Sequence, residues 1–158
     1  MNKKNFKKES LNFNVSILSV KDLDACFELD KVALQGFWSR RQWEEELNNN
    51  QKICLGIYKS SGLIALVASF LIIDELNVTA LGVHPEYRQQ GYGKLLLNNL
   101  FDEAIKRGGE TASLEVSSLN HRAIALYKKL GFKSSGLRLQ YYKDGSDAII
   151  KTRALRLS

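Results

Sequence analysis

The sequence predicts an α/β fold in which helices cover a mixed, mostly antiparallel sheet. Three patterns carry this prediction. β-Rich apolar runs follow one another between residues 53 and 83, apolar positions recur at helical spacing between residues 91 and 107, and strand-like and helix-like patterns alternate after that. The chain has 158 residues, 44% of them apolar, and its single proline and lack of a Gly/Ser linker mark no domain boundary. We expect one domain at residues 14–158, preceded by a basic, flexible tail at residues 1–13.

The N-terminal part of the domain predicts one strand and two helices. Residues 15–18 form a short β-rich run, and Ser19 can cap a helix whose apolar side chains recur every three or four residues. Ser39 and Gln42 have the spacing of a capping box, so a second helix begins after Ser39. Phe37 and Trp38 then lie on the loop that leads into this second helix.

The middle of the chain predicts three neighbouring strands and a long helix. The runs 53–58 and 63–73 are joined by a short Ser/Gly turn and form a hairpin, and the run 76–83 adds a third antiparallel strand. From Gly91 the apolar pattern becomes helical and continues for about four turns until the glycine pair that begins at Gly108.

The C-terminal part predicts a strand, a helix and a final hairpin. Residues 112–116 alternate, so Glu115 points away from the face that carries the apolar side chains beside it. Asn120 can cap a helix that contains Tyr127. Two strands at 137–142 and 148–155 are then expected around Asp144 and Gly145, a dipeptide that favours tight hairpin turns.

Composition limits the function classes without choosing one. The formal charge of +6 favours anionic ligands in general, and part of it comes from Lys3, Lys4, Lys7 and Lys8, which fit a solvated tail or an electrostatic arm toward RNA. The lysines are otherwise scattered without interleaved aromatic residues, so we expect no specific nucleic-acid binding. No apolar run reaches the ~18 residues needed to cross a bilayer and no secretion signal is apparent, so we expect no membrane partner and a cytoplasmic location.

The two cysteines predict core positions and no chemistry. Cys26 and Cys54 lie far apart in apolar surroundings, with neither CxxC spacing nor a nearby histidine. An activated thiolate and a metal site are therefore not expected.

One loop has the character of a phosphate-binding site. Residues 89–94 join a strand to a helix through Gly91 and Gly93, and glycines there let backbone N–H groups of the first helical turn approach a pyrophosphate. The same spacing also occurs in ordinary strand–helix turns, so the loop alone does not decide between the two interpretations.

Longer motifs carry a family resemblance. The segment R-Q-Q-G-Y-G, following L-G-V-H-P-E-Y, resembles the acetyl-CoA loop of the GNAT superfamily of N-acetyltransferases. The segments 114–132 and 141–148 are similar to the bacterial RimI-type ribosomal-protein-alanine N-acetyltransferases, so the motifs together cover about half of the chain. The resemblance implies the GNAT fold, in which two parallel strands splay apart and admit the pantetheine arm of acetyl-CoA, with no metal. The residues it implies for cofactor binding are Leu81, Gly82, Val83, Gln89, Gln90, Gly91, Tyr92, Gly93, Lys94 and Asn120.

The resemblance also implies catalytic and substrate-binding residues. A protein α-amine with a pKa near ~7.7–8.0 needs only a modest base, and Glu115 is the candidate, with a salt bridge to a lysine as the alternative. Tyr127 is the candidate acid for the leaving sulfur, with plain core packing as the alternative, and the backbone N–H of Val83 is the candidate oxyanion donor. Trp38, Tyr141 and Tyr142 match positions that flank the incoming peptide terminus, although aromatic residues at such spacing can equally belong to the core.

The implied reaction is direct transfer of an acetyl group from acetyl-CoA to a protein N-terminus in a ternary complex, most specifically to the N-terminal alanine of ribosomal protein S18. The chain departs from the family at Ser117, Leu119 and Gly36–Phe37, which weakens the substrate inference more than the chemistry. The alternatives are an acetyltransferase for other protein N-termini, lysine or a small-molecule amine, and a non-catalytic acyl-CoA-binding module. His84 and His121 are given no catalytic role.

Overall fold

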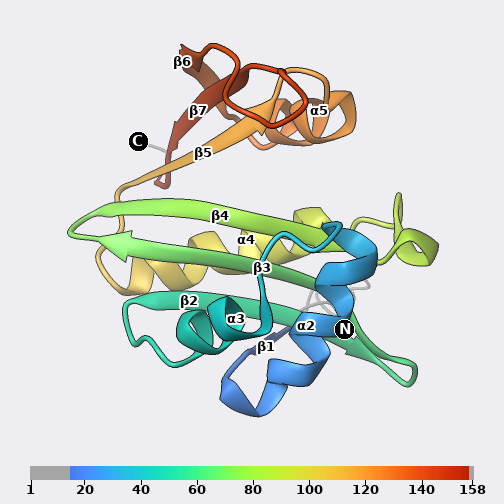
Figure 1. Cartoon of the computed structure of the whole chain (residues 1–158). Coiled ribbons are helices and arrows are strands. Elements are labelled where there is room, and N and C mark those ends of the chain that lie inside the picture. The colour runs from blue at the N-terminus through green and yellow to red at the C-terminus, as the bar shows by residue number, and fades with distance from the viewer. Residues whose placement is uncertain (1–14, 157–158) are drawn as a thin grey trace, which may run out of the picture.

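The computed structural model describes residues 15–156, so the predicted tail at residues 1–13, with its four lysines, lies outside the described residues. Within them a seven-stranded sheet has the order β1-β2-β3-β4-β5-β7-β6 (Figure 1). Every neighbouring pair is antiparallel except β4 and β5, which are parallel, so the predicted mixed sheet is confirmed. The strands are β1 (Val15–Ile17), β2 (Lys52–Lys59), β3 (Gly62–Ile72), β4 (Glu75–Val83), β5 (Thr111–Ser117), β6 (Lys133–Arg138) and β7 (Ala148–Ala154).

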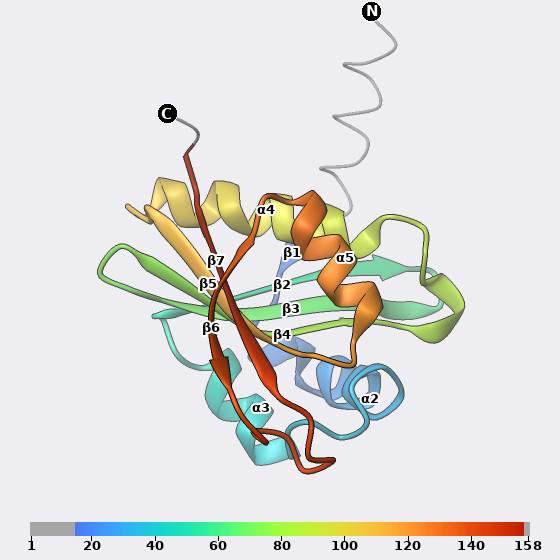
Figure 2. The same ribbon diagram turned by 90° about the horizontal axis from the view of Figure 1, so that it is seen from above.

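Four α-helices of the described chain cover the sheet on both faces. Figure 2 shows α2 and α3 on one face and α4 and α5 on the other, so the sheet forms the middle layer. Each helical layer buries its own apolar cluster against the sheet, the larger one beneath α4. The helices are α2 (Leu23–Ala33), α3 (Arg40–Leu47), α4 (Tyr92–Lys106) and α5 (His121–Lys129), with short 3₁₀ turns η1 (Val20–Asp22) and η2 (Pro85–Tyr87). No helix among the described residues is both long and apolar enough to cross a membrane.

The predicted start of α3 is confirmed by its hydrogen bonds, and the predicted start of α2 is shifted by one short turn. At α3, the Gln42 backbone N–H donates to Ser39 Oγ (3.1 Å) and the Ser39 N–H donates to Gln42 Oε1 (2.8 Å), which is a complete capping box. At α2, Ser19 precedes the η1 turn instead of the helix itself, and its N–H donates to Asp22 Oδ2 (2.9 Å). The chain thus enters α2 through one tighter turn.

The strand predicted at 137–142 is wrong in its position. The observed strand β6 is Lys133–Arg138, and an irregular loop follows it. Gln140 adopts a left-handed conformation (φ 51°) and its N–H donates to Asp147 Oδ1 (2.9 Å), which closes the loop on itself. Asp144 and Gly145 do form a turn, since the Gly145 N–H donates to Tyr142 O (2.9 Å), and the paired strands β6 and β7 form the expected hairpin, but the turn lies inside the longer loop that connects them.

Both cysteines are free and buried, as predicted, and burial raises the pKa of each thiol from 9.0 to about 12. The free energy of unfolding should therefore fall as the pH rises above about 9. There the thiols ionise in the unfolded chain but stay protonated in the native protein, which costs at most about 1.4 kcal/mol per pH unit for each thiol. Urea unfolding at about pH 8, 9 and 10 measures this slope.

A Cys26→Ala variant should show a shallower slope than the wild type, although it is less stable at every pH because its core contains a cavity. A slope that is the same in both proteins would contradict the assignment of the pH dependence to the buried thiols.

Candidate active site

The parallel strands β4 and β5 separate halfway along their length. Their pairing begins at Glu75–Thr111 and ends at Val78–Leu114, although β4 goes on to pair with β3 and β5 with β7 (Figure 1). A β-bulge makes Thr79 an extra residue of β4 at this point, and its Oγ1 donates to Ala68 O (3.0 Å). Bulges bend the strand that carries them, so the bulge explains why the two strands splay. The predicted splay is confirmed.

The far half of β4 leaves backbone groups free on the side of the gap. The His84 N–H donates to Ile64 O (2.7 Å), and residues of an antiparallel pair alternate between bonded and non-bonded positions. Leu81 and Val83 therefore direct their N–H and C=O groups away from β3. Arg88 Nε donates to Val83 O (3.1 Å), as expected for a carbonyl on that open side.

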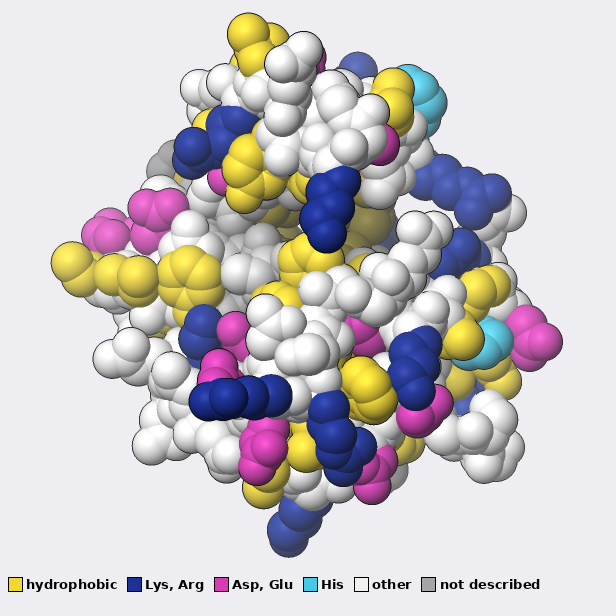
Figure 3. All heavy atoms as spheres, viewed as in Figure 1, with side chains coloured by type: hydrophobic (Ala, Val, Ile, Leu, Met, Phe, Trp, Pro, Cys, Tyr) yellow, Lys and Arg dark blue, Asp and Glu magenta, His cyan; other side chains and the backbone are white. Residues whose placement is uncertain are grey.

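A cavity of about 230 Å³ fills the gap between the two strands. Figure 3 shows this face of the molecule, with an apolar hollow below the part formed by β5–β7 and α5. Glu115 is the one charged residue among those that line it. The lining residues are Leu34, Phe37, Val78, Thr79, Ala80, Leu81, Leu114, Glu115, Val116, Ser117, Asn120, Ala123, Tyr127 and Tyr142.

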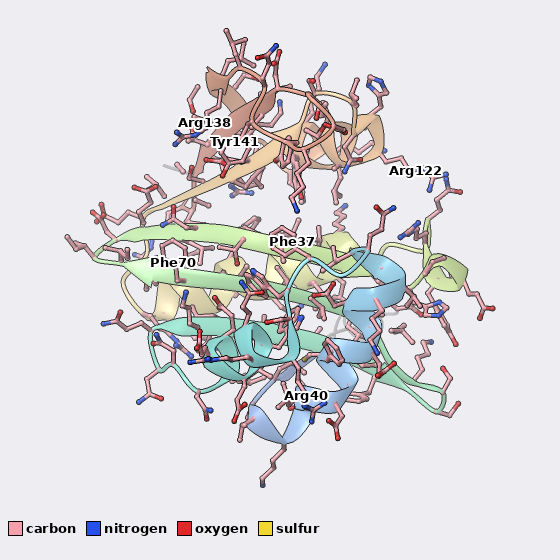
Figure 4. All side chains as sticks on the ribbon, viewed as in Figure 1. Phe37, Arg40, Phe70, Arg122, Arg138 and Tyr141 are labelled. Carbon is pink, nitrogen blue, oxygen red and sulfur yellow. The ribbon has the colours of Figure 1, made fainter. Side chains whose placement is uncertain are left out.

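Glu115 has the orientation that the alternating pattern predicts. Its side chain is 31% exposed, whereas Leu114 and Val116 on either side are buried. Glu115 Oε1 accepts a hydrogen bond from Arg138 Nε (2.9 Å), which comes from β6. The sequence raised a salt bridge to a lysine as an alternative, and the observed partner is an arginine. Figure 4 shows Arg138 beside Tyr141, and the Arg138 guanidinium lies over the Tyr141 ring, 5.9 Å from its centroid.

Of the three tyrosines predicted for catalysis or substrate binding, Tyr127 and Tyr142 line the cavity. Tyr127 is buried on α5 and meets Phe132 edge-on, with 5.7 Å between ring centroids. Burial, and then the neighbouring Tyr142, raises the pKa of Tyr127 to about 12. Burial and then Glu115 raise the pKa of Tyr142, so the carboxylate and both phenols share one site. Tyr141 is 54% exposed outside the cavity and packs edge-on against Tyr142.

The loop between α2 and α3 supplies the opposite wall, with a different aromatic residue from the predicted one. Phe37, labelled in Figure 4, lines the cavity. Trp38 instead packs against the buried Trp43 with 4.8 Å between ring centroids. The loop approaches β4 closely because residue 82 is a glycine, where a Cβ would lie 3.0 Å from Leu34 Cγ. The sequence placed both aromatics on this loop, but no local signal told which of them faces the cavity.

The predicted phosphate loop has the expected backbone form. Gly91 (φ 86°) and Gln89 (φ 63°) are both left-handed, and α4 begins directly after Gly91. The Leu95 N–H donates to Gly91 O (3.0 Å), so the N–H groups before it in the first turn have no intrahelical acceptor. Leu81 Cδ2 lies 3.8 Å from where a Cβ of Gly93 would be, so the loop adjoins the cavity.

Of the remaining predicted cofactor residues, Gln90 and Lys94 belong to this loop and Asn120 lies at the start of α5. Gln90 Nε2 donates to Glu86 O (3.4 Å), and the Lys94 side chain is exposed. Asn120 caps α5 as predicted, since its Oδ1 accepts from the Ala123 N–H (3.2 Å), and it also lines the cavity. Within residues 15–156 no three His, Cys, Asp or Glu side chains are grouped in a way that could hold a metal ion.

A splayed pair of parallel strands, a glycine loop at a helix N-terminus and a cavity between them define the acetyltransferase class of α/β proteins. The model of the acetyltransferase (GNAT) family matches residues 20–132, and the chain belongs to this family. It is 34% identical over 139 residues to the [ribosomal protein bS18]-alanine N-acetyltransferase of Escherichia coli, covering 86% of this chain and 93% of the relative. It is 33% identical over 147 residues to the N-alpha-acetyltransferase RimI of Mycobacterium tuberculosis, covering 88% and 90%.

The solved structures agree with the sequence relatives. The crystal structure of the ribosomal-protein-alanine N-acetyltransferase from E. coli superimposes with a TM-score of 0.84 at 32% identity, covering 91% of this chain and 94% of that one. This chain is therefore a GNAT acetyltransferase related to the RimI enzymes, a family that uses acetyl-CoA.

Proposed function

We propose that this protein transfers the acetyl group of acetyl-CoA to the N-terminal α-amine of a protein, with the N-terminal alanine of ribosomal protein bS18 as the first candidate. The observation that carries the proposal is the cavity that places Glu115 and Tyr127 together beside the phosphate loop. The 34% identity to an enzyme named for the bS18 alanine supports the choice of acceptor.

The residues present fit both the pyrophosphate and the pantetheine arm of acetyl-CoA. The pyrophosphate would bind the unpaired N–H groups at the start of α4, in the loop from Gln89 to Lys94, where the helix dipole favours negative charge. The pantetheine arm would pair with the open edge of β4 at Leu81 and Val83 and pass Asn120. Acetyl-CoA supplies the activated acyl group, and the protein has to orient it, take the proton that the amine loses and stabilise the thiolate that leaves.

Glu115 would take the proton from the incoming amine. Arg138 binds only Oε1 of this carboxylate, which leaves Oε2 for the amine or for a bridging water. As nitrogen attacks the thioester carbon, the oxygen of that carbonyl gains negative charge, and the Val83 N–H faces the gap where it can donate to this oxygen. Phe37 and Tyr142 border the space left for the acceptor.

Tyr127 would assist departure of the CoA sulfur when the C–S bond breaks. With its pKa raised to about 12, the phenol stays protonated at neutral pH. Thiols have a pKa near ~8.5, so Tyr127 is the weaker acid and serves first as a hydrogen-bond donor to the developing thiolate. Neither cysteine can carry the acetyl group, because both thiols are buried and hold their protons.

The proposal is tested by acetyl-CoA turnover on a peptide that carries the bS18 amino terminus. We expect one acetyl group at the α-amine, located by mass spectrometry, and none on the same peptide with its α-amine blocked. Lysine peptides, other protein N-termini and polyamines complete the panel. Acetylation confined to lysine or to a small amine would reject the protein N-terminus as acceptor, and acetyl-CoA binding without turnover on any amine would favour a non-catalytic module.

A further inference from the structure

Asp30 is a buried carboxylate that lies outside the cavity yet binds the loop that forms one of its walls. It belongs to α2 and is fully shielded from solvent. Its Oδ1 accepts from the Phe37 N–H (2.6 Å), and its Oδ2 accepts from the Trp38 N–H (2.9 Å) and from Trp43 Nε1 (2.6 Å). Both oxygens act only as acceptors, as in an ionised carboxylate, and hydrogen bonds to such a group are the stronger kind.

The backbone of Asp30 binds the same loop. Its carbonyl oxygen accepts from the Leu34 N–H (2.8 Å) and from the Gly36 N–H (3.3 Å). Gln35 (φ 57°) and Gly36 (φ 74°) are both left-handed, so the chain reverses sharply before Phe37. We name the segment 34–38 the wall loop. Asp30 accepts hydrogen bonds from the backbone N–H groups of four of its five residues, all except Gln35.

The wall loop has a direct part in the cavity. Leu34 and Phe37 line it across from β5, where Glu115 lies. Phe37 is still 53% exposed, so its ring is not held by burial, and its backbone position depends on the bond to Asp30. The hydrogen bonds of the Asp30 carboxylate go to Phe37, Trp38 and Trp43 and not to the loop 89–94, so we expect its loss to change the acceptor side more than the cofactor side.

We propose that Asp30 is a positioning residue for acceptor recognition, whose buried carboxylate sets the place of Phe37 in the cavity wall. The proposal rests on the proposed function in one respect, that the acceptor amine enters beside Phe37. An asparagine cannot replace the carboxylate, because its NH₂ group would face an N–H donor where an acceptor is needed. A misplaced wall lowers the rate through lost orientation of the acceptor.

The chain carries its own reporter for this loop. Its two tryptophans are Trp38 and Trp43, and both bind Asp30. The intrinsic fluorescence of the protein therefore reports on the wall loop and on the helix that follows it. This readout needs no substrate, so it separates the position of the loop from the identity of the acceptor.

The experiment compares the Asp30→Asn variant of the full chain with Asp24→Asn. Asp24 lies on the same helix but is 81% exposed and pairs with Arg40 at the surface. For Asp30→Asn we expect red-shifted emission with stronger quenching by acrylamide, and a KM for the acceptor peptide raised about tenfold or more. The Kd for acetyl-CoA should stay within about twofold of the wild type, and Asp24→Asn should change none of these values.

A second variant, Trp43→Phe, keeps the proposal testable if Asp30→Asn does not fold. It removes one of the three N–H donors, keeps an aromatic ring in the core and leaves Trp38 as the reporter, so a smaller rise in the acceptor KM of about threefold is expected. Equal losses of acceptor and acetyl-CoA binding, or unchanged emission in Asp30→Asn, would overturn the proposal. If the wild type acetylates no peptide, the proposed function fails, while the emission of Asp30→Asn still decides whether the carboxylate holds the loop.

Discussion

Replacing Glu115 by glutamine should lower kcat on the acceptor peptide about 100-fold or more and leave the Kd for acetyl-CoA unchanged. Glutamine has the same shape and can still accept the hydrogen bond from Arg138, so the loss isolates the ability to take a proton. The α-amine of the peptide titrates near ~7.7–8.0, and without a base only its neutral fraction reacts. The deficit should therefore be largest near neutral pH and shrink as the pH rises to about 9.

Steady-state kinetics at about pH 7 and pH 9, with acetyl-CoA binding measured by calorimetry, check this prediction. Glu103→Gln is a matched control, because Glu103 also pairs with an arginine (Arg107, 3.1 Å) but lies on α4 outside the cavity. If Glu115→Gln retains the wild-type kcat at neutral pH, the carboxylate serves only as the partner of Arg138.

Local sequence patterns were sufficient where a contact is local. The alternation along residues 112–116 placed Glu115 opposite the buried Leu114, and the Ser39–Gln42 spacing placed the start of α3. Both depend on residues a few positions apart, where the geometry of a strand or a helix turn fixes the outcome.

Contacts between distant residues were not accessible in this way. Arg138 reaches Glu115 from 23 positions further along the chain, and Asp30 selects which face of the wall loop turns inward. The strand expected at 137–142 failed for a related reason. The local β-rich pattern there is outweighed by the Asp147 and Asp144 carboxylates, which accept hydrogen bonds from the backbone N–H groups of Gln140 and Ser146 and fold the segment into a loop.

Replacing Tyr127 by phenylalanine should lower kcat by about 10- to 100-fold while the protein stays folded. The ring of phenylalanine preserves the edge-on contact with Phe132, so the free energy of unfolding should change by less than about 1 kcal/mol. Because burial raises the pKa of the wild-type phenol to about 12, kcat should show no alkaline decline from Tyr127 below about pH 10. The comparison of kcat in the two proteins across this range is the measurement.

Tyr58→Phe is the control for loss of a phenol elsewhere. Tyr58 lies on β2 and donates to Asp22 Oδ1 (2.6 Å), so its loss should affect stability but not kcat. A Tyr127→Phe enzyme with the wild-type kcat would mean that the sulfur leaves without help from this hydroxyl. A raised Kd for acetyl-CoA with unchanged kcat would instead make Tyr127 a binding residue, because a group that acts only as the C–S bond breaks stabilises the transition state and leaves the bound ground state unchanged.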